Sequence, residues 1–350
     1  MHELLFQTFQ KTKTMQSKKI LITGAAGFIG FHAVKRLSAE GCKIVGIDNL
    51  CLSNKTPIKT HRLNELNKMS SQLNFTFIQQ DINYPKELEV LFSNHAFDFV
   101  FHFAAETGVR DSILFPQKYM KTNVQGFVNV IDLCHKYKVK KFIYASSSSV
   151  YGLNSKKEFS ENDITECPIS PYAASKKSNE LTAYSYSYLH KLHTVGLRFF
   201  TVYGPWGRPD MFYFLFSNAI KNNKSISVFN HGNMKRDLTY IDDVTSSLAI
   251  VLNYSQPPQK VPYHIYNIGS SESLKLIKLM NIMENVIGQN ANKILKDIQE
   301  GDMINTKADM SLFYQHYGYK PITNFEDGFV LFYDWYKTYK NKNIQIRSSI

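Results

Sequence analysis

The chain has 350 residues, enough for one large domain or two ordinary domains with a substantial core. It contains no apolar run long enough for a membrane-spanning helix and no signal-peptide segment at its N-terminus, so no membrane partner is expected. The four cysteines are far apart and form no Cys-x-x-Cys pair, which argues against a disulfide framework and a metal site and favours the reducing cytoplasm. The net charge of +12 comes from scattered lysines without a basic arm, which argues against nucleic-acid binding and suits a small phosphate-rich substrate.

The first 200 residues alternate between predicted strands and predicted helices. Helices are expected after the first strand, over 123–137 and from Tyr172 onward, and buried strands are expected in 18–23, 42–49, 74–81, 97–105, 140–148 and 194–200. This alternation predicts an α/β fold with a Rossmann-type, doubly wound parallel sheet.

After about residue 200 the pattern becomes less regular, because prolines and glycines interrupt it, and helices return near 274–287 and 325–340. We therefore expect a smaller C-terminal α/β domain for the substrate, and we predict that strands around 235–268 return to the first sheet. The expected divisions are an N-terminal extension over 1–17, the doubly wound domain over 18–200, mostly the substrate domain over 201–340, and a tail over 341–350.

A glycine-rich motif follows the first strand. It reads Gly24-Ala-Ala-Gly27-Phe-Ile-Gly30 and departs by one residue from the dinucleotide fingerprint G-x-G-x-x-G. Small residues let the backbone turn tightly and approach a pyrophosphate at a helix N-terminus. Asp48 ends the next strand, where a carboxylate accepts hydrogen bonds from the adenosine ribose and repels a 2′-phosphate. The motif and its context predict that the cofactor is NAD and not NADP.

A second group of residues pairs a serine-rich strand end with a tyrosine and a lysine. Ser147 lies in "ASSSSVYG", at the end of a predicted parallel strand, where ligands bind in such sheets. Tyr172 and Lys176 are four residues apart, so a helix places both on one face. A nearby ammonium and a positively charged nicotinamide favour the phenolate, which predicts a lowered pKa for Tyr172. We expect Tyr172 to be a general base, with Ser147 sharing the proton on the substrate oxygen.

These motifs resemble the extended short-chain dehydrogenase/reductase superfamily, and within it most closely the UDP-glucuronate 4-epimerase family. The resemblance covers roughly residues 18–340, and its most specific blocks are "GPWGRPDM" from Gly204 and "GNMKRD" from Gly232. One departure is Glu106, a position at which the family more often lacks an acid.

The resemblance implies roles for individual residues. Ser147, Tyr172 and Lys176 would be catalytic, and Lys176 would also hold the nicotinamide ribose. The implied cofactor-binding residues are Gly24, Gly27, Phe28, Ile29, Gly30, Asp48, Asn49, Asp81, Ile82, Phe103, Ala104, Ala105, Asn123, Tyr172, Lys176 and Val202. The implied substrate-binding residues are Ser149, Thr201, Arg208, Val228, Arg236 and Asp302.

The implied reaction is the interconversion of UDP-glucuronate and UDP-galacturonate through a 4-keto intermediate. Three alternatives stay open: an epimerase of UDP-glucose or UDP-N-acetylglucosamine, a UDP-glucuronate decarboxylase, and a non-enzymatic NAD-binding scaffold. Dehydratases and decarboxylases of the superfamily typically carry an acid just before "VYG", where this chain has Ser149. An intact Ser147, Tyr172 and Lys176 argue against a scaffold.

The helices that begin near Val124 and Tyr172 each carry an apolar face, and Leu181, Tyr184 and Leu189 belong to the second. In relatives, two such helices pair with their symmetry mates, so a homodimer is expected. His102 lies on an apolar strand and is expected to be a structural histidine with a satisfied hydrogen bond.

Overall fold

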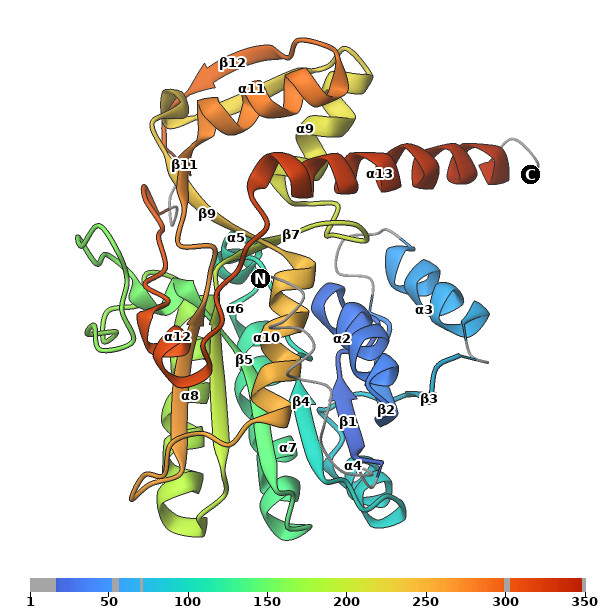
Figure 1. Ribbon diagram of the computed structural model, residues 1–350, viewed down its shortest axis with the longest axis vertical. Helices are drawn as coiled ribbons and strands as arrows, with labels where there is room; N and C mark the ends of the chain where they lie inside the picture. Colours follow the sequence, from blue (N-terminus) through green and yellow to red (C-terminus); the bar gives the residue numbers. More distant parts are fainter. Residues whose placement is uncertain (1–16, 52–56, 70–71, 299–302, 348–350) are drawn as a thin grey trace.

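A seven-stranded parallel sheet forms the centre of the molecule (Figure 1). The computed structural model describes residues 17–51, 57–69, 72–298 and 303–347. The strand order is β10-β6-β5-β4-β1-β2-β3, which contains the doubly wound order of a dinucleotide-binding sheet and confirms the predicted fold class. The strands are β1 (Lys19–Thr23), β2 (Lys43–Asp48), β3 (Phe75–Gln79), β4 (Phe99–His102), β5 (Lys141–Ser147), β6 (Thr194–Phe199) and β10 (Tyr263–Ile268).

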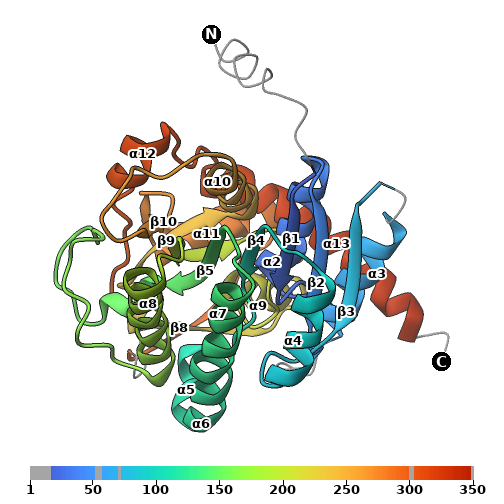
Figure 2. The same ribbon diagram turned by 90° about the horizontal axis from the view of Figure 1, so that it is seen from below.

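The strands are apolar almost throughout because helices cover both faces of the sheet (Figure 2). Successive side chains of a strand point to opposite faces, so Ile20 and Ile22 join one core and Leu21 joins the other. The first core includes α2 (Phe28–Ala39) and α10 (Ile241–Asn253). The second core includes α4 (Pro85–Asn94), α7 (Gly126–Lys136) and α8 (Pro171–His190).

The second half of the chain builds two smaller sheets beyond the end of the main sheet. One pairs β11 (Ser273–Lys275), β9 (Lys235–Tyr240) and β7 (Thr201–Tyr203), and the other pairs β12 (Asn292–Lys296) with β8 (Ser225–Phe229). Strand β10 lies at the edge of the main sheet, but β9 does not, because it pairs with β7 and β11 instead. The prediction that strands around 235–268 return to the main sheet is therefore wrong for β9.

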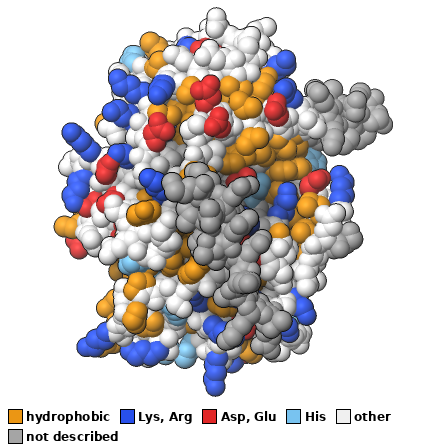
Figure 3. Space-filling model, viewed as in Figure 1, with side chains coloured by type: hydrophobic (Ala, Val, Ile, Leu, Met, Phe, Trp, Pro, Cys, Tyr) orange, Lys and Arg blue, Asp and Glu red, His pale blue; other side chains and the backbone are white. Residues whose placement is uncertain are grey.

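Three further helices belong to this second half, and a fourth crosses from it towards the first. They are α9 (Phe212–Lys221), α11 (Leu276–Ile287), α12 (Ser311–Tyr317) and α13 (Phe325–Arg347). Helix α13 runs across the top of α2 and α3 (Ile58–Lys68) in Figure 1. It extends to Arg347, beyond the expected end near residue 340. Figure 3 shows hydrophobic side chains gathered along and just below α13.

The remaining short helices lie between β4 and α8 and in the loop after β8. They are α5 (Val109–Leu114), α6 (Pro116–Tyr119), the π-helix η1 (Met120–Gln125), and the 3₁₀-helices η2 (Ser148–Tyr151) and η3 (Asn230–Gly232). From β1 the chain continues outward to β2 and β3 on one side of the sheet, and from β4 it continues outward to β5 and β6 on the other side. The strand order therefore reverses between β1 and β4. Ligands of doubly wound sheets bind in the crevice at this switch point, so the candidate site is expected there.

Candidate active site

The glycine-rich turn between β1 and α2 is shaped so that only residues without a side chain fit at two of its positions. Gly24 has φ of +72°, and a Cβ there would lie 2.7 Å from the backbone nitrogen of Ala104. A Cβ on Gly30 would lie 2.1 Å from the carbonyl oxygen of Gly24. No side chain caps the N-terminus of α2, so its first N–H groups point towards the switch point without a capping partner. Such groups favour an anion, and the turn fits a pyrophosphate.

The acid at the end of β2 lies in a polar cluster. Asp48 is 4% exposed, accepts a hydrogen bond from the Leu50 N–H at 2.8 Å, and forms an ion pair with Lys59 at 3.0 Å. The neighbouring Asn49 donates through Nδ2 to Asp81 Oδ2 at 2.9 Å. The structure thus brings Asp48, Asn49 and Asp81 together at the ends of β2 and β3. Lys59 carried no sequence signal, because its link to Asp48 depends on the docking of α3.

The helix that carries the tyrosine and the lysine begins where the sequence dictates. Ser170 caps α8 by accepting a hydrogen bond from the Ala173 N–H at 3.1 Å, and Pro171 occupies the first turn. This start places Tyr172 in the first turn and Lys176 one turn later. Lys176 is 3% exposed and donates through Nζ to the carbonyl oxygen of Ala145 on β5 at 2.8 Å.

The serine at the end of β5 faces the same region. Ser147 lies close enough to Tyr172 to lower the pKa of its phenol. Its Oγ also accepts hydrogen bonds from Ser149, from the hydroxyl at 2.9 Å and from the backbone N–H at 3.2 Å. The structure therefore brings the three predicted catalytic residues together around the end of β5 and the start of α8.

The pKa of Tyr172 moves opposite to the sequence prediction. Burial raises the pKa of the phenol above its ordinary value, while Ser147 and the charge of Arg208 lower it. Burial also lowers the pKa of Lys176 to about 8. Among the protein's own groups desolvation outweighs the nearby charges, so the predicted lowering of the Tyr172 pKa depends on the positively charged nicotinamide. The cation that acts on the phenol is Arg208, which the sequence had placed at the substrate.

Arg208 follows β7 and lies close enough to Tyr172 for its charge to lower the pKa of the phenol. Its guanidinium holds the carboxylate of Asp210 through Nε and Nη2. Gly108, at the start of α5, approaches from the other side, since a Cβ there would lie 3.8 Å from Nη2 of Arg208. Tyr119 also lies next to Tyr172. The two rings are edge-on with 6.2 Å between their centroids, and the Tyr119 hydroxyl donates a hydrogen bond to the Thr107 carbonyl at 2.9 Å. Sequence reasoning missed Tyr119, because no motif marks it.

Asn123 lies within the π-helix η1, which the sequence pattern did not predict. It is 1% exposed, and its amide bonds the Glu106 N–H at 2.8 Å, the Glu106 carbonyl at 3.0 Å and the Ser175 hydroxyl at 3.0 Å. Asn123 thereby joins the loop after β4 to the residue before Lys176. The carboxylate of Glu106 pairs with Lys118 at 3.0 Å. Glu106 is therefore neutralised within the chain.

The other predicted contacts divide by their accessibility. Val228 and Ile82 are buried in the two cores, at 0% and 3% exposure, so neither side chain is accessible to a ligand in this structure. Arg236 on β9 donates to the carbonyls of Lys235 at 3.0 Å and Ile304 at 3.1 Å. Asp302 lies outside the described residues. The partly buried predicted residues are Gly27, Ile29, Asn49, Asp81, Phe103, Ala104, Ala105, Ser149, Tyr172, Thr201, Val202, Arg208 and Arg236.

His102 has the structural role that its apolar strand suggested. Its Nδ1 lies 2.9 Å from Oγ1 of Thr23, and burial lowers its pKa to about 3. Among the described residues, no group of three His, Cys, Asp or Glu side chains could hold a metal ion. Within the same residues, no helix has the length and apolar character needed to cross a bilayer.

A dinucleotide turn at the switch point, combined with a tyrosine–lysine pair on the helix after β5, defines the extended short-chain dehydrogenase/reductase class. The chain belongs to the NAD-dependent epimerase/dehydratase family, whose model matches residues 20–269. This membership confirms the predicted resemblance and the predicted cofactor. The close approach of Gly24 to Ala104 and the uncapped start of α2 fit NAD, which Asp48 and Asn49 would hold at its adenosine end.

Three known proteins illustrate the likeness. Protein CapI of Staphylococcus aureus is 41% identical over 337 residues, covering 93% of this chain and 100% of that protein. The UDP-glucuronic acid 4-epimerase of Bacillus cereus, solved with UDP-glucuronic acid and NAD, superposes with a TM-score of 0.84 at 33% identity, covering 91% of this chain and 99% of that one. The UDP-glucose 4-epimerase of Thermotoga maritima, solved with UDP-glucose, has a TM-score of 0.82 at 28% identity, with the same coverage of 91% and 99%. At the level of the family, the chain is a NAD-dependent nucleotide-sugar epimerase.

Proposed function

We propose that the protein interconverts UDP-glucuronate and UDP-galacturonate through a 4-keto intermediate. The observation that carries this proposal is the position of Arg208, whose positive charge acts on Tyr172. Its guanidinium binds the carboxylate of Asp210 through Nε and Nη2. A guanidinium has five N–H donors, so further donors remain for a second carboxylate. A sugar that carries a carboxylate at carbon 5 therefore finds a matching cation beside the base.

The residues around β5 and α8 would move one proton in each direction. The Tyr172 phenolate would take the proton from the 4-hydroxyl, and Ser147 would hydrogen-bond the same oxygen. NAD, when bound, supplies the acceptor and donor of the hydride at carbon 4. The tethered 4-keto sugar would then rotate, so that its opposite face is presented to the site. Tyr172 would return its proton to the oxygen at carbon 4 in this new orientation. The Lys176 ammonium would favour the phenolate in each half-reaction.

Separate features weigh against the alternatives. Ser149 occupies the place at which a lyase of this superfamily would carry an acid, and its hydroxyl is engaged with Ser147 at 2.9 Å. This arrangement disfavours a decarboxylase. A neutral-sugar epimerase has no use for Arg208 beside the base, although the likeness to a UDP-glucose 4-epimerase keeps that activity as the second candidate. A scaffold would not need Ser147, Tyr172 and Lys176 together.

One assay separates these functions. The purified protein is incubated with UDP-glucuronate, UDP-glucose or UDP-N-acetylglucosamine, and the products are followed by NMR. The proposal expects UDP-galacturonate from the first substrate and little product from the other two. A UDP-pentose as main product would identify a decarboxylase, turnover of UDP-glucose alone would identify a neutral-sugar epimerase, and no turnover would leave the scaffold.

We also propose that the protein is a cytoplasmic homodimer. Apolar side chains on α7 and α8 reach the surface, with Leu181 at 59%, Tyr188 at 55% and Leu189 at 67% exposed. Two such helices from each copy would form a four-helix contact that covers this face. Light scattering should give twice the mass of the chain, and Leu181→Glu with Leu189→Glu should convert it to a monomer.

A further inference from the structure

The turn that precedes Arg208 has a strained backbone. Trp206 has φ of +61°, which is an outlier for a bulky side chain, and the next residue, Gly207, has no room for a Cβ because one would lie 2.1 Å from the Tyr213 hydroxyl. Residues held in such conformations persist only where their surroundings fix them, and they concentrate at functional sites. The contacts that hold this turn therefore bear on Arg208, the residue that follows it.

Three consecutive carbonyl groups of this turn accept hydrogen bonds from the dinucleotide-binding half of the molecule. His32 on α2 donates from Nε2 to the carbonyl of Pro205 at 2.9 Å. Arg62 on α3 donates to the carbonyl of Trp206 from Nε at 3.0 Å and from Nη2 at 2.6 Å, and Nη2 lies 3.4 Å from the carbonyl of Gly207. Arg62 also donates from Nη1 to the carbonyl of Ala26 at 3.0 Å, which connects the same guanidinium to the glycine-rich turn.

Arg62 is an unusual residue to find at such a place. Arg62 is only 2% exposed. Within the part of the chain that the structure describes, its guanidinium forms hydrogen bonds to carbonyl groups but no ion pair. Burial lowers its pKa to about 10, so the guanidinium stays charged at neutral pH. A buried cation that lacks an acid is costly compared with an apolar side chain of the same size. Its rigid, planar fork of donors, however, reaches the carbonyls of Trp206 and Ala26 from different nitrogens at once, a geometry that the single nitrogen of a lysine does not reproduce.

The aromatic side chains around the turn complete the enclosure. The Trp206 ring lies 5.5 Å from that of Phe31 on α2, 5.3 Å from that of Trp335 and 5.7 Å from that of Tyr339, the last two on α13. Helices α2, α3 and α13 surround this part of the chain in Figure 1. The aromatic contacts fix the ring of Trp206, but the backbone of the turn is held by Arg62 and His32.

We propose that Arg62 is a positioning residue that holds the Trp206–Gly207 turn in its strained form and so keeps Arg208 beside Tyr172. The proposal rests on the proposed function, in which Arg208 binds the sugar carboxylate. Arg62 does not touch the substrate in this scheme and acts only through the turn. The loss of Arg62 should therefore weaken the binding of UDP-glucuronate by no more than the contribution that Arg208 makes to that binding.

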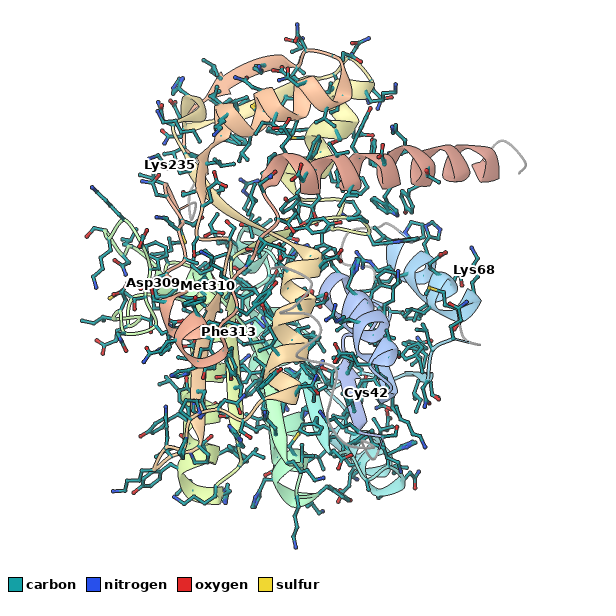
Figure 4. The ribbon with its side chains drawn as sticks, viewed as in Figure 1. Cys42, Lys68, Lys235, Asp309, Met310 and Phe313 are labelled. Carbon is teal, nitrogen blue, oxygen red and sulfur yellow. The ribbon has the colours of Figure 1, made fainter. Side chains whose placement is uncertain are left out.

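The first test observes the turn directly and needs no substrate. The chain contains two tryptophans, so Trp335→Phe leaves Trp206 as the single tryptophan, whose emission is recorded with excitation that is selective for tryptophan over tyrosine. In that background Arg62→Met should red-shift the emission of Trp206 and increase its quenching by acrylamide. Lys68→Met is the matched control, because Lys68 is an exposed cation at the far end of the same helix (Figure 4). If Arg62→Met and Lys68→Met give the same emission and quenching, Arg62 does not hold the turn and the proposal is wrong.

The second test separates positioning from a general structural role. Arg62→Met should raise the KM for UDP-glucuronate about 10-fold or more, because a charge-assisted hydrogen bond contributes on the order of 1.5–3 kcal/mol. In an Arg208→Ala background the same change should add little, since both act through one contact. Effects that multiply in the double variant would overturn the proposal.

Arg62→Lys provides a second variant in case Arg62→Met does not fold. It keeps the charge but not the fork of donors, so it should resemble Arg62→Met in both tests, and wild-type behaviour would overturn the proposal. If Arg208→Ala alone leaves the KM for UDP-glucuronate unchanged while Arg62→Met still alters the Trp206 emission, the hold on the turn is supported and the proposed substrate is wrong.

Discussion

Glu180 and Arg198 form a buried ion pair with two parallel hydrogen bonds, from Nε to Oε1 at 2.8 Å and from Nη2 to Oε2 at 2.9 Å. Both side chains are at most 3% exposed. The hydroxyl of Ser146 also donates to Glu180 Oε1, at 2.6 Å. Glu180 lies one turn beyond Lys176 on α8, and Ser146 immediately precedes Ser147 on β5. Glu180 therefore joins α8 to β6 through Arg198 and to β5 through Ser146, so it aligns the two elements, α8 and β5, that carry the predicted catalytic residues.

Breaking this pair should cost both stability and turnover. We expect Glu180→Leu to lower the free energy of unfolding by roughly 3–5 kcal/mol, because Arg198 would remain buried without its counter-charge. The double variant Glu180→Leu/Arg198→Met should recover much of that loss, since no buried charge remains. Urea denaturation measures both values. A double variant less stable than the single one would contradict this explanation.

Tyr172→Phe tests the general base. Removing the phenolic oxygen should leave NAD binding and the melting temperature close to those of the wild type, and should lower kcat by roughly 10²–10⁴. Tyr184→Phe is the matched control, because Tyr184 lies on the same helix and is 48% exposed. Near-normal epimerisation by Tyr172→Phe would remove Tyr172 from the mechanism.

Two histidines with strongly lowered pKa values predict the response to acid: His102, which is buried, and His32, which is partly buried. Burial lowers the pKa values of both His32 and His102 to about 3, whereas an exposed histidine in the unfolded chain titrates near 6.5. Between these pH values the unfolded chain binds more protons, so each histidine lowers stability by about 1.4 kcal/mol for each pH unit below 6.5. We expect the free energy of unfolding to fall steeply from pH 6.5 to pH 4.5. In His102→Gln this slope should be smaller, and an unchanged slope would show that His102 is not buried in its neutral form.

The preference for NAD rests on Asp48, whose carboxylate would lie against a 2′-phosphate. The structure adds Lys59, which pairs with Asp48 at 3.0 Å. Protein purified from cells should carry NAD, as mass spectrometry of the released cofactor can establish. Asp48→Asn should bind NADP more tightly than the wild type does, because it removes the negative charge and leaves Lys59 in place. Copurified NADP in the wild type would reverse the role given to Asp48.

The sequence predicted those parts of the site that depend on short spacings. The glycine turn, Asp48 and the tyrosine–lysine pair each lie within one strand–turn–helix unit or one helical turn, so their spacings, taken together, predicted their roles. Lys59, Arg62 and Tyr119 could not be predicted in this way, because each acts on residues that only the tertiary fold brings near. Strand β9 was misplaced for the same reason, since its partners β7 and β11 are chosen by packing and not by its own pattern.

The sign of the Tyr172 pKa shift shows a second limit of the sequence. A pattern of residues reveals that a charge lies nearby, but not how far the phenol is removed from water. For Tyr172, burial has the largest effect and raises the pKa of the phenol. The effects that lower this pKa come from Ser147 and Arg208. In the proposal above, the strained turn at Trp206 sets the position of Arg208, and although this turn lies in the specific block "GPWGRPDM", the block does not reveal that Arg62 and His32 hold it.

Arg208 leads to the most specific prediction about the intermediate. The 4-keto form of a uronic acid is a β-keto acid, which loses carbon dioxide when the breaking carbon–carbon bond aligns with the carbonyl π system. An epimerase must therefore hold the carboxylate in an unproductive orientation while the sugar turns. Arg208, together with the Thr201 hydroxyl, would supply this hold through charge-assisted hydrogen bonds, each worth roughly 1.5–3 kcal/mol.

Arg208→Ala should thus change both affinity and product. We expect the KM for UDP-glucuronate to rise by about 10-fold or more, because at least one charge-assisted bond is lost. Traces of a UDP-4-ketopentose should appear together with an equal amount of NADH, since a ketone that leaves the site after losing carbon dioxide has not taken the hydride back. NMR detects the ketopentose, and absorbance at the NADH band detects the reduced cofactor. An Arg208→Ala enzyme with unchanged KM and no ketopentose would make Arg208 an ordinary loop residue and would remove the main reason for assigning an acidic sugar.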